Sequence, residues 1–230
     1  NFIFLKDNSL IAIQGPLAEK IIHFLPGANN LSFMNSLVIN YLKHSIIITR
    51  SGYTGEDGFE ISVPNSIVLN FIEQTMENTN AKLCGLGARD SLRLEAGLCL
   101  YGNELNESTT PIEANLNWAI NKERLNDKSL NGHEILLNQI NRGINKYKIA
   151  IKSLSKSILR TGMKLLDNEN NEIGYITSGA YSPIIKSSIA IGYIKRKLNI
   201  NEKIFTTIRN KIEELEITKL PFVLHNYKKG

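Results

Sequence analysis

Apolar and polar positions alternate in short runs through the first third of the chain. Three of these runs are rich in isoleucine and valine, which is typical of half-buried β-strands: Leu37–Tyr41, Ser45–Arg50 and Phe59–Val63. Longer segments repeat their apolar residues with a helical period, at Leu17–Leu25 and at Ile67–Met76. Strands and helices that mix in this order, with hairpins, predict an α+β fold rather than a doubly wound α/β fold.

The second half of the chain has a different pattern. Residues 121–143 are polar with helical spacing and carry a narrow apolar stripe. Beyond Arg142, short β-prone runs alternate with turn residues, which predicts a small β-barrel or sandwich. These runs are Lys148–Ile151, Lys164–Asp167, Glu172–Thr177, Ser188–Ile194, Lys203–Ile208 and Glu214–Lys219. We therefore predict a domain boundary near Arg142, between residues 1–142 and residues 143–230.

The run from Gly85 to Gly102 places charged residues among leucines and alanines. If the run is helical, Arg89 and Arg93 stand four residues apart on one face, where like charges repel unless each has its own partner. The charge pattern alone favours a helix whose arginines form ordinary structural ion pairs. The alternative is a helix that carries ionic groups to a binding site.

Together with Ser51–Pro64, this run resembles the aminomethyltransferase family, the T-protein of the glycine cleavage system. Further short matches follow in the family's order along the chain: Gln14–Pro16, Thr109–Ala114, Thr177–Pro183, Ala190–Tyr193 and Leu220–Val223. The resemblance implies an α+β fold with T-protein-like folate-binding domains in residues 1–142, incomplete at the N-terminus. It also implies a small C-terminal β-barrel in residues 143–230.

The start of the chain bears on the catalytic chemistry. Phe2–Leu5 has a strand-like composition. The resemblance places the family's usual catalytic aspartate in a portion upstream of Asn1, so the catalytic residue is unknown from this sequence. We expect residues 1–230 alone to be weakly active or inactive, because loss of a general acid typically costs about 10²–10⁴-fold in rate.

The resemblance implies transfer of a one-carbon unit from the aminomethyl-lipoyl arm of the H-protein to tetrahydrofolate, with release of ammonia. Tetrahydrofolate is then a co-substrate, and the lipoylated H-protein is the expected protein partner. Two alternatives share the fold: the folate-binding portion of a dimethylglycine- or sarcosine-oxidising enzyme, and a non-catalytic folate-binding protein. The Gly55–Gly58 sequence and the Cys99–Gly102 run favour the T-protein.

Glu60 is the first candidate for ligand binding. Strand alternation places it on the face opposite Phe59 and Ile61, and an exposed glutamate is the default interpretation for such a position. The resemblance implies instead that Glu60 binds the pterin ring of the folate. A carboxylate suits this role because it can accept two parallel hydrogen bonds from a ring N–H and an amino group.

Arg89 is the second candidate, since the resemblance implies that it contacts the folate. A guanidinium holds a carboxylate or a ring carbonyl with a rigid fork of donors. The alternative is an ion pair with Asp90, Glu95 or another acid. Asp90 and Arg93 stand three residues apart and can pair with each other, which would leave Arg89 for a ligand.

Two aromatic residues complete the candidate site. The resemblance implies that the C-terminal segment folds back and that Tyr227 touches the substrate, although the family's paired tyrosine is here Tyr227-Lys228. Trp118 matches a family position near the folate pocket, where stacking on the ligand and packing in the core are equally open. Tyr53 is a weaker candidate for stacking.

Composition and residue spacing bear on which other partners the protein has. The formal charge of +5 is spread along the chain without an aromatic-interleaved basic patch, so we expect no nucleic-acid partner. Cys84 and Cys99 have no metal-ligand spacing and the four histidines lie far apart, so we expect no metal. No apolar run approaches the roughly 18 residues of a membrane span, so we expect no membrane partner. The resemblance implies the mitochondrial matrix, or the cytoplasm of a bacterium.

Overall fold

The computed structural model describes residues 2–77 and 79–229. The chain forms two compact units. Unit one comprises Asn1–Leu92 together with Leu224–Gly230, and unit two comprises Arg93–Val223. This division follows the contacts within each unit, and the domain boundary near Arg142 stays a prediction about the sequence.

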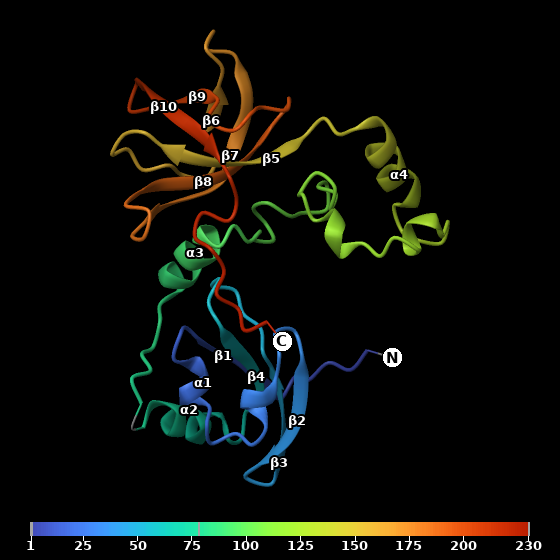
Figure 1. Cartoon of the computed structure of the whole chain (residues 1–230), viewed down its shortest axis with the longest axis vertical. Coiled ribbons are helices and arrows are strands. Elements are labelled where there is room, and N and C mark those ends of the chain that lie inside the picture. Colours follow the sequence, from blue (N-terminus) through green and yellow to red (C-terminus); the bar gives the residue numbers. More distant parts are fainter. Residues whose placement is uncertain (1, 78, 230) are drawn as a thin grey trace. The chain divides into compact units, whose positions relative to one another are not determined.

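Unit one is built on an antiparallel sheet with the strand order β1-β4-β3-β2 (Figure 1). The strands are β1 (Asn8–Gln14), β2 (Ser36–Tyr41), β3 (His44–Thr49) and β4 (Gly58–Pro64). Two α-helices, α1 (Ala18–Ile21) and α2 (Val68–Met76), and a 3-10 turn, η1 (Ala28–Asn30), accompany the sheet. Residues from α1 and α2 share one apolar core with the inner face of the sheet.

The inner face of β4 follows the predicted alternation. Phe59, Ile61 and Val63 are fully buried in the core, whereas Glu60 and Ser62 on the other face are half-buried. Burial of each large apolar side chain contributes roughly 1.5–3 kcal/mol to folding. This burial fixes the register of β4, because a slip of one residue would move the whole apolar set to the other face.

Two sequence predictions for unit one were wrong. The run Phe2–Leu5 is exposed and forms no strand, because a strand needs a neighbour to pair with and β1 begins only at Asn8. The helix predicted for Leu17–Leu25 is reduced to the single turn of α1, and the residues after it form further turns. The helix after Pro64 is confirmed as α2.

The connection between the sheet of unit one and the barrel of unit two is largely helical and irregular. The arginine-bearing helix is α3 (Leu86–Glu95), and the division between the units falls within it. Short 3-10 turns follow, η2 (Asn117–Ala119) and η3 (Arg124–Asn126), and then α4 (His133–Arg142). The polar helical pattern of residues 121–143 is therefore confirmed for its second half.

Unit two contains a closed β-barrel with the strand order β10-β5-β8-β7-β6-β9 (Figure 1). Its strands are β5 (Tyr147–Ser153), β6 (Lys164–Leu166), β7 (Glu172–Ser182), β8 (Ser187–Ile194), β9 (Lys203–Ile208) and β10 (Lys211–Thr218). Isoleucines and leucines from these strands fill its interior. The predicted α+β class and the C-terminal barrel are both confirmed. Closure leaves no free strand edge in the barrel.

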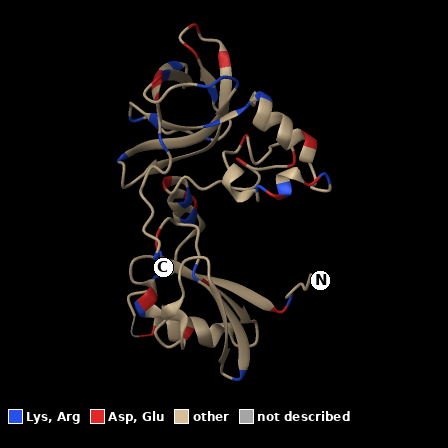
Figure 2. Cartoon of the chain, turned by 45° about the vertical axis from the view of Figure 1, so that its right-hand side comes forward, with Lys and Arg blue, Asp and Glu red and all other residues tan. Residues whose placement is uncertain are grey.

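Surface chemistry is mixed over the described residues. Figure 2 shows Lys and Arg interspersed with Asp and Glu along both units. Within residues 2–77 and 79–229, no helix has the length and apolar character needed to cross a bilayer, and no three metal-ligating side chains gather. Of the two free cysteines, Cys84 is exposed and Cys99 is half-buried.

Candidate functional site

Glu60 occupies the centre of the outer face of β4. Its backbone pairs with Ala12 of β1 and Thr49 of β3. The Ser51 hydroxyl donates a hydrogen bond of 2.6 Å to Glu60 Oε2. In the part of the chain that the structure describes, this is the only hydrogen bond to the carboxylate, so Oε1 keeps its acceptor capacity for another group.

The segment Gly52–Gly58, which we call the glycine loop, is built around the side chain of Gln14. The Gln14 amide nitrogen donates to the Ser51 carbonyl at 3.0 Å, and its Oε1 accepts from the Thr54 hydroxyl at 3.2 Å. The amide passes so close to the loop that a Cβ on Gly52 would lie 1.8 Å from Gln14 Oε1. A side chain at this position would therefore have to displace the Gln14 amide.

Gly58 and Gly55 satisfy two different requirements of the glycine loop. A Cβ on Gly58 would lie 2.6 Å from the Ile13 carbonyl, so the close approach of two backbones excludes a side chain there. Gly55 has a φ of +79°, in the region that glycine adopts without strain. The turn at Gly55 therefore has a backbone conformation that favours glycine.

Arg89 lies near the glycine loop through Tyr53. Its guanidinium carbon is 5.0 Å from the centre of the Tyr53 ring, a cation–π distance. The Arg89 side chain is exposed and has no ion-pair partner among the described residues. Its planar fork of donors is therefore held at one face by an aromatic ring while its N–H groups remain available.

Arg93, one helical turn further along α3, is held quite differently. It is 1% exposed and forms a 3.1 Å ion pair with the buried Glu104, while its second terminal nitrogen donates to the Ser178 hydroxyl at 2.7 Å. This arrangement confirms that the two arginines of α3 have separate partners. It also shows that the interpretation as structural ion pairs applies to Arg93 and not to Arg89.

Tyr227 lies in the C-terminal part of unit one, on top of Phe33. The two rings are stacked with centroids 4.1 Å apart and an interplanar angle of 10°. The backbone N–H of Asn226 donates to the Gly55 carbonyl at 2.8 Å, which ties this segment to the glycine loop. Burial raises the pKa of the Tyr227 phenol, so the hydroxyl stays protonated at neutral pH and can donate a hydrogen bond.

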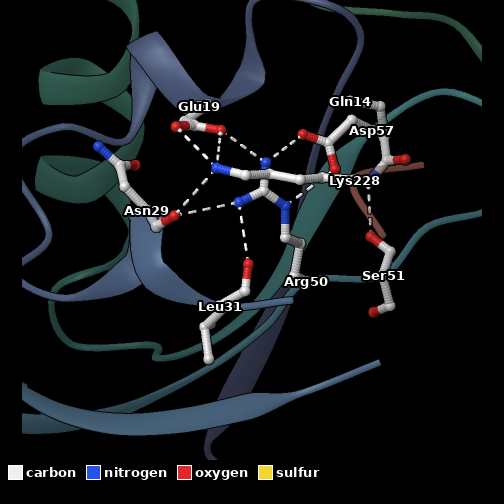
Figure 3. Close-up of polar contacts among 8 residues, drawn as sticks. All are labelled: Gln14, Glu19, Asn29, Leu31, Arg50, Ser51, Asp57 and Lys228. Atoms are coloured by element: carbon white, nitrogen blue, oxygen red, sulfur yellow. Dashed lines mark hydrogen bonds and ion pairs between the residues drawn. The ribbon is translucent and has the colours of Figure 1, made fainter. Parts of the chain in front are cut away.

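Beside the loop, a cluster of charged groups surrounds Arg50 (Figure 3). Arg50 is fully buried and holds the Asp57 carboxylate through two nitrogens, with Nε at 2.9 Å from Oδ1. Its Nη2 also contacts Glu19 at 2.7 Å, and its Nη1 donates to the Leu31 carbonyl at 3.0 Å. The guanidinium of Arg50 thus satisfies its donors with acids and carbonyls, as burial of a charge requires.

The acids of this cluster remain ionised at neutral pH. Burial alone raises the pKa of Asp57, but the hydrogen bonds and the positive charge of Arg50 outweigh it and hold that pKa below its ordinary value. Hydrogen bonds from Arg50 and then from Lys228 lower the pKa of Glu19. The cluster therefore contains two cations, Arg50 and Lys228, and two carboxylates, so its formal charges cancel.

Trp118 belongs to unit two, in the 3-10 turn η2. Its side chain is 80% exposed, so the alternative that it packs in the core is wrong. A role in stacking on a ligand stays a prediction. By contrast, Glu60, Arg89 and Tyr227 all lie in unit one. Glu60 contacts Ser51 beside the glycine loop, Arg89 contacts Tyr53 within it, and the residue before Tyr227, Asn226, is bonded to Gly55.

Sequence reasoning missed three residues that shape this region. Ser51 gave no signal beyond its place next to the first glycine of the loop. Gln14 was noticed within the Gln14–Pro16 match, but nothing in the pattern showed that its amide reaches the loop. Arg50 was read as the end of a strand, and only its distant partners in the fold reveal that it is buried.

Comparisons with known proteins cover most of the chain. The family profile described as the GCVT N-terminal domain matches residues 5–124, and the profile of the glycine cleavage T-protein C-terminal barrel domain matches residues 148–223. Among relatives, the mitochondrial aminomethyltransferase of Dictyostelium discoideum is 43% identical over 237 residues, covering 98% of this chain and 59% of that protein. That of Solanum tuberosum is 43% identical over 230 residues, with coverage of 97% and 56%.

A solved structure of the same kind of protein also matches this chain. A crystal structure of the glycine cleavage system aminomethyltransferase T from Bartonella henselae matches with a TM-score of 0.90 at 38% identity. The match covers 96% of this chain and 61% of that chain. The chain thus spans less than two thirds of the length of these relatives. Matching profiles, relatives and structure together show that the chain belongs to the glycine cleavage T-protein family.

Proposed function

We propose that the protein represented by this chain is an aminomethyltransferase, which moves a one-carbon unit from the aminomethyl-lipoyl arm of an H-protein to tetrahydrofolate and releases ammonia. The observation that carries the proposal is the glycine loop. Glu60 through Ser51, Arg89 through Tyr53, and Tyr227 through Asn226 are all held at this loop, within a chain of the T-protein family.

The residues of unit one suit the chemistry of a folate. Glu60 has one carboxylate oxygen held by Ser51 and one without a hydrogen bond from the described residues, so it can accept N–H groups of a pterin. Arg89 can offer its fork to a carbonyl or carboxylate of the same ligand. Bound tetrahydrofolate would supply the nucleophilic nitrogen that accepts the carbon.

The contribution of these residues to the rate is positioning. Holding two reactants in a productive geometry can supply roughly 7–11 kcal/mol of the barrier, provided the groups that hold them are themselves fixed. Hydrogen bonding of Glu60 and stacking of Arg89 and Tyr227 provide such fixing. We assign the general acid that assists ammonia departure to a residue outside this chain. We assign to Trp118 the role of stacking on the ligand.

The partners and compartment follow from the same proposal. The H-protein, through its lipoyl arm, is the protein partner, and no metal, nucleic acid or membrane takes part. The relatives from Dictyostelium discoideum and Solanum tuberosum are named as mitochondrial, which supports the mitochondrial matrix as the compartment. Their names also favour aminomethyl transfer over dimethylglycine or sarcosine oxidation and over a purely binding role.

Titration calorimetry with tetrahydrofolate tests the binding part of this proposal. We expect the chain to bind the ligand and Arg89→Met to weaken binding by about 1.5–3 kcal/mol, the usual range for a hydrogen bond to a charged group. Arg142→Met, an exposed arginine at the end of α4, is the matched control and should bind normally. Equal affinity of the Arg89 and Arg142 variants would remove Arg89 from the site.

The transfer reaction is tested in a protein that contains this chain at the full length of its relatives. Release of ammonia from an aminomethylated H-protein should require tetrahydrofolate. A full-length protein that binds folate but releases no ammonia would favour the non-catalytic alternative.

A further inference from the structure

The C-terminal residues 225–229, which we call the Tyr227 segment, contact the rest of unit one on both sides of Tyr227. On one side, the backbone of Asn226 donates to Gly55, and its side-chain amide donates to Glu56 Oε1 at 2.8 Å. On the other side stands Lys228, at the position where the family's second tyrosine is expected. Tyr227 is therefore fixed by its two neighbours as well as by stacking on Phe33.

Lys228 makes polar contacts through its side chain, which Figure 3 shows, and also through its backbone. Its ammonium lies 3.2 and 3.0 Å from the two oxygens of Glu19 and 3.4 Å from the Asn29 carbonyl. Its backbone carbonyl accepts from the Phe33 N–H at 3.1 Å, and its backbone N–H helps to lower the pKa of the Asp57 carboxyl. One residue thus joins the Tyr227 segment to α1, to η1 and to Phe33.

An isolated ion pair at the surface contributes little to stability. The Lys228–Glu19 pair is not isolated, because the buried Arg50 also forms an ion pair with the Glu19 carboxylate. Arg50 also fixes Asp57, the acid whose pKa the Lys228 backbone N–H helps to lower. Lys228 therefore meets acceptors that are already in place, and less side-chain entropy is lost when the contacts form than in an ordinary surface pair.

We propose that Lys228 is a positioning residue that clamps the Tyr227 segment onto the Arg50 cluster and so sets the position of the Tyr227 ring. The proposal rests on the proposed function in one respect, the contact of Tyr227 with substrate. The clamp itself is independent of that function. Loss of the Lys228 ammonium should release the segment without unfolding unit one, whose core lies elsewhere.

The test compares Lys228→Met with Lys229→Met, which removes an adjacent exposed ammonium. Hydrogen exchange of the Tyr227 segment, followed by mass spectrometry, reports whether it is docked. We expect exchange about three- to tenfold faster in Lys228→Met and unchanged in Lys229→Met. We expect Lys228→Arg, which keeps the charge, to restore slow exchange.

A double-variant comparison identifies the partner of Lys228. Glu19→Gln should also speed exchange, and adding Lys228→Met to it should have little further effect, because contacting residues are not additive. Full additivity would show that Lys228 acts without Glu19 and would overturn the ion-pair part of the clamp. Equal exchange in Lys228→Met and the unsubstituted protein would overturn the clamp as a whole.

Tetrahydrofolate affinity, measured on the same variants, tests the positioning role. We expect Lys228→Met to bind about three- to tenfold more weakly, and Lys228→Arg to bind normally. Faster exchange with unchanged affinity and unchanged turnover would refute the positioning role while leaving the clamp standing. If the unsubstituted protein does not bind tetrahydrofolate, the proposed function and the positioning role both fail, and hydrogen exchange still decides whether the clamp exists.

Discussion

The Ser51 hydroxyl and the Glu60 carboxylate are joined by a 2.6 Å hydrogen bond that links the start of the glycine loop to the centre of β4. Ser51 is itself held through its carbonyl by Gln14. The direction of the Glu60 carboxylate is therefore set by a chain of contacts that begins on β1. Such fixing is what a group that must present one oxygen to a ligand requires.

Glu60→Gln should weaken tetrahydrofolate binding by about 1.5–3 kcal/mol, because glutamine carries no charge and replaces one of the two acceptor oxygens with a donor NH2 group. The unfolding midpoint should barely change, since the side chain is only half-buried. Titration calorimetry gives the affinity, with Glu73→Gln on the exposed side of α2 as the control. Unchanged affinity in the Glu60 variant would exclude it from the site.

Ser51→Ala should weaken the same binding by about 0.5–1.5 kcal/mol, the net value of one hydrogen bond, because the carboxylate loses its orienting donor. Ser51→Thr keeps the hydroxyl and should retain most of the affinity. Calorimetry on the two variants separates the hydrogen bond from the size of the side chain. A stronger effect from threonine than from alanine would show that space at residue 51 matters more than the hydrogen bond.

Gly58→Ala should lower the free energy of unfolding by about 1–3 kcal/mol, because its Cβ meets a backbone carbonyl that cannot move without shifting β1. Gly52→Ala meets the movable end of Gln14 and should cost less, at about 1 kcal/mol for a displaced hydrogen bond. Urea unfolding measures both. Gly87→Ala in α3, where the added methyl has open space, should instead stabilise the helix.

Glu104→Gln should destabilise unit two by about 3 kcal/mol, because it removes a carboxylate that faces the fully buried Arg93. Glu107→Gln, at an exposed position in the same connection, should change stability by less than about 0.5 kcal/mol. Thermal unfolding followed by near-ultraviolet circular dichroism compares them. Similar midpoints for the two variants would mean that Arg93 is satisfied without Glu104.

The Arg50 cluster should make unit one sensitive to acid. Arg50 and Lys228 are the charged groups that hold the pKa values of Asp57 and Glu19 below their ordinary values. Such depressed pKa values contribute stability that is complete above about pH 4–5 and is lost as the pH falls through the folded-state pKa. Urea midpoints between pH 6 and pH 3 should therefore decline.

Asp57→Asn provides the check on this acid sensitivity. It should be less stable at pH 6, because Arg50 loses its bidentate partner, and it should show a shallower decline toward pH 3. An identical decline in the variant and the unsubstituted protein would assign the acid sensitivity to carboxylates elsewhere.

The local sequence pattern predicted those features that depend on residues close together in the chain. The alternation in β4 fixed which face Glu60 occupies, because burial of Phe59 and Ile61 leaves the carboxylate only the other side. The isoleucine-rich runs after Arg142 identified the strands of the barrel. Their limits were less well predicted, because β7 continues beyond Thr177 to Ser182 and β10 begins at Lys211 rather than Glu214. The like charges of Arg89 and Arg93 predicted that the two would have different partners.

The sequence by itself therefore determined the class of the fold, the strands of the C-terminal barrel along the chain and the side of the sheet on which Glu60 lies. Tertiary structure alone decided that Arg50 is buried, that Gln14 supports the glycine loop, and that Lys228 reaches Glu19. The last contact joins residues 209 positions apart. Contacts of this kind depend on how the chain closes on itself, and no local periodicity encodes them.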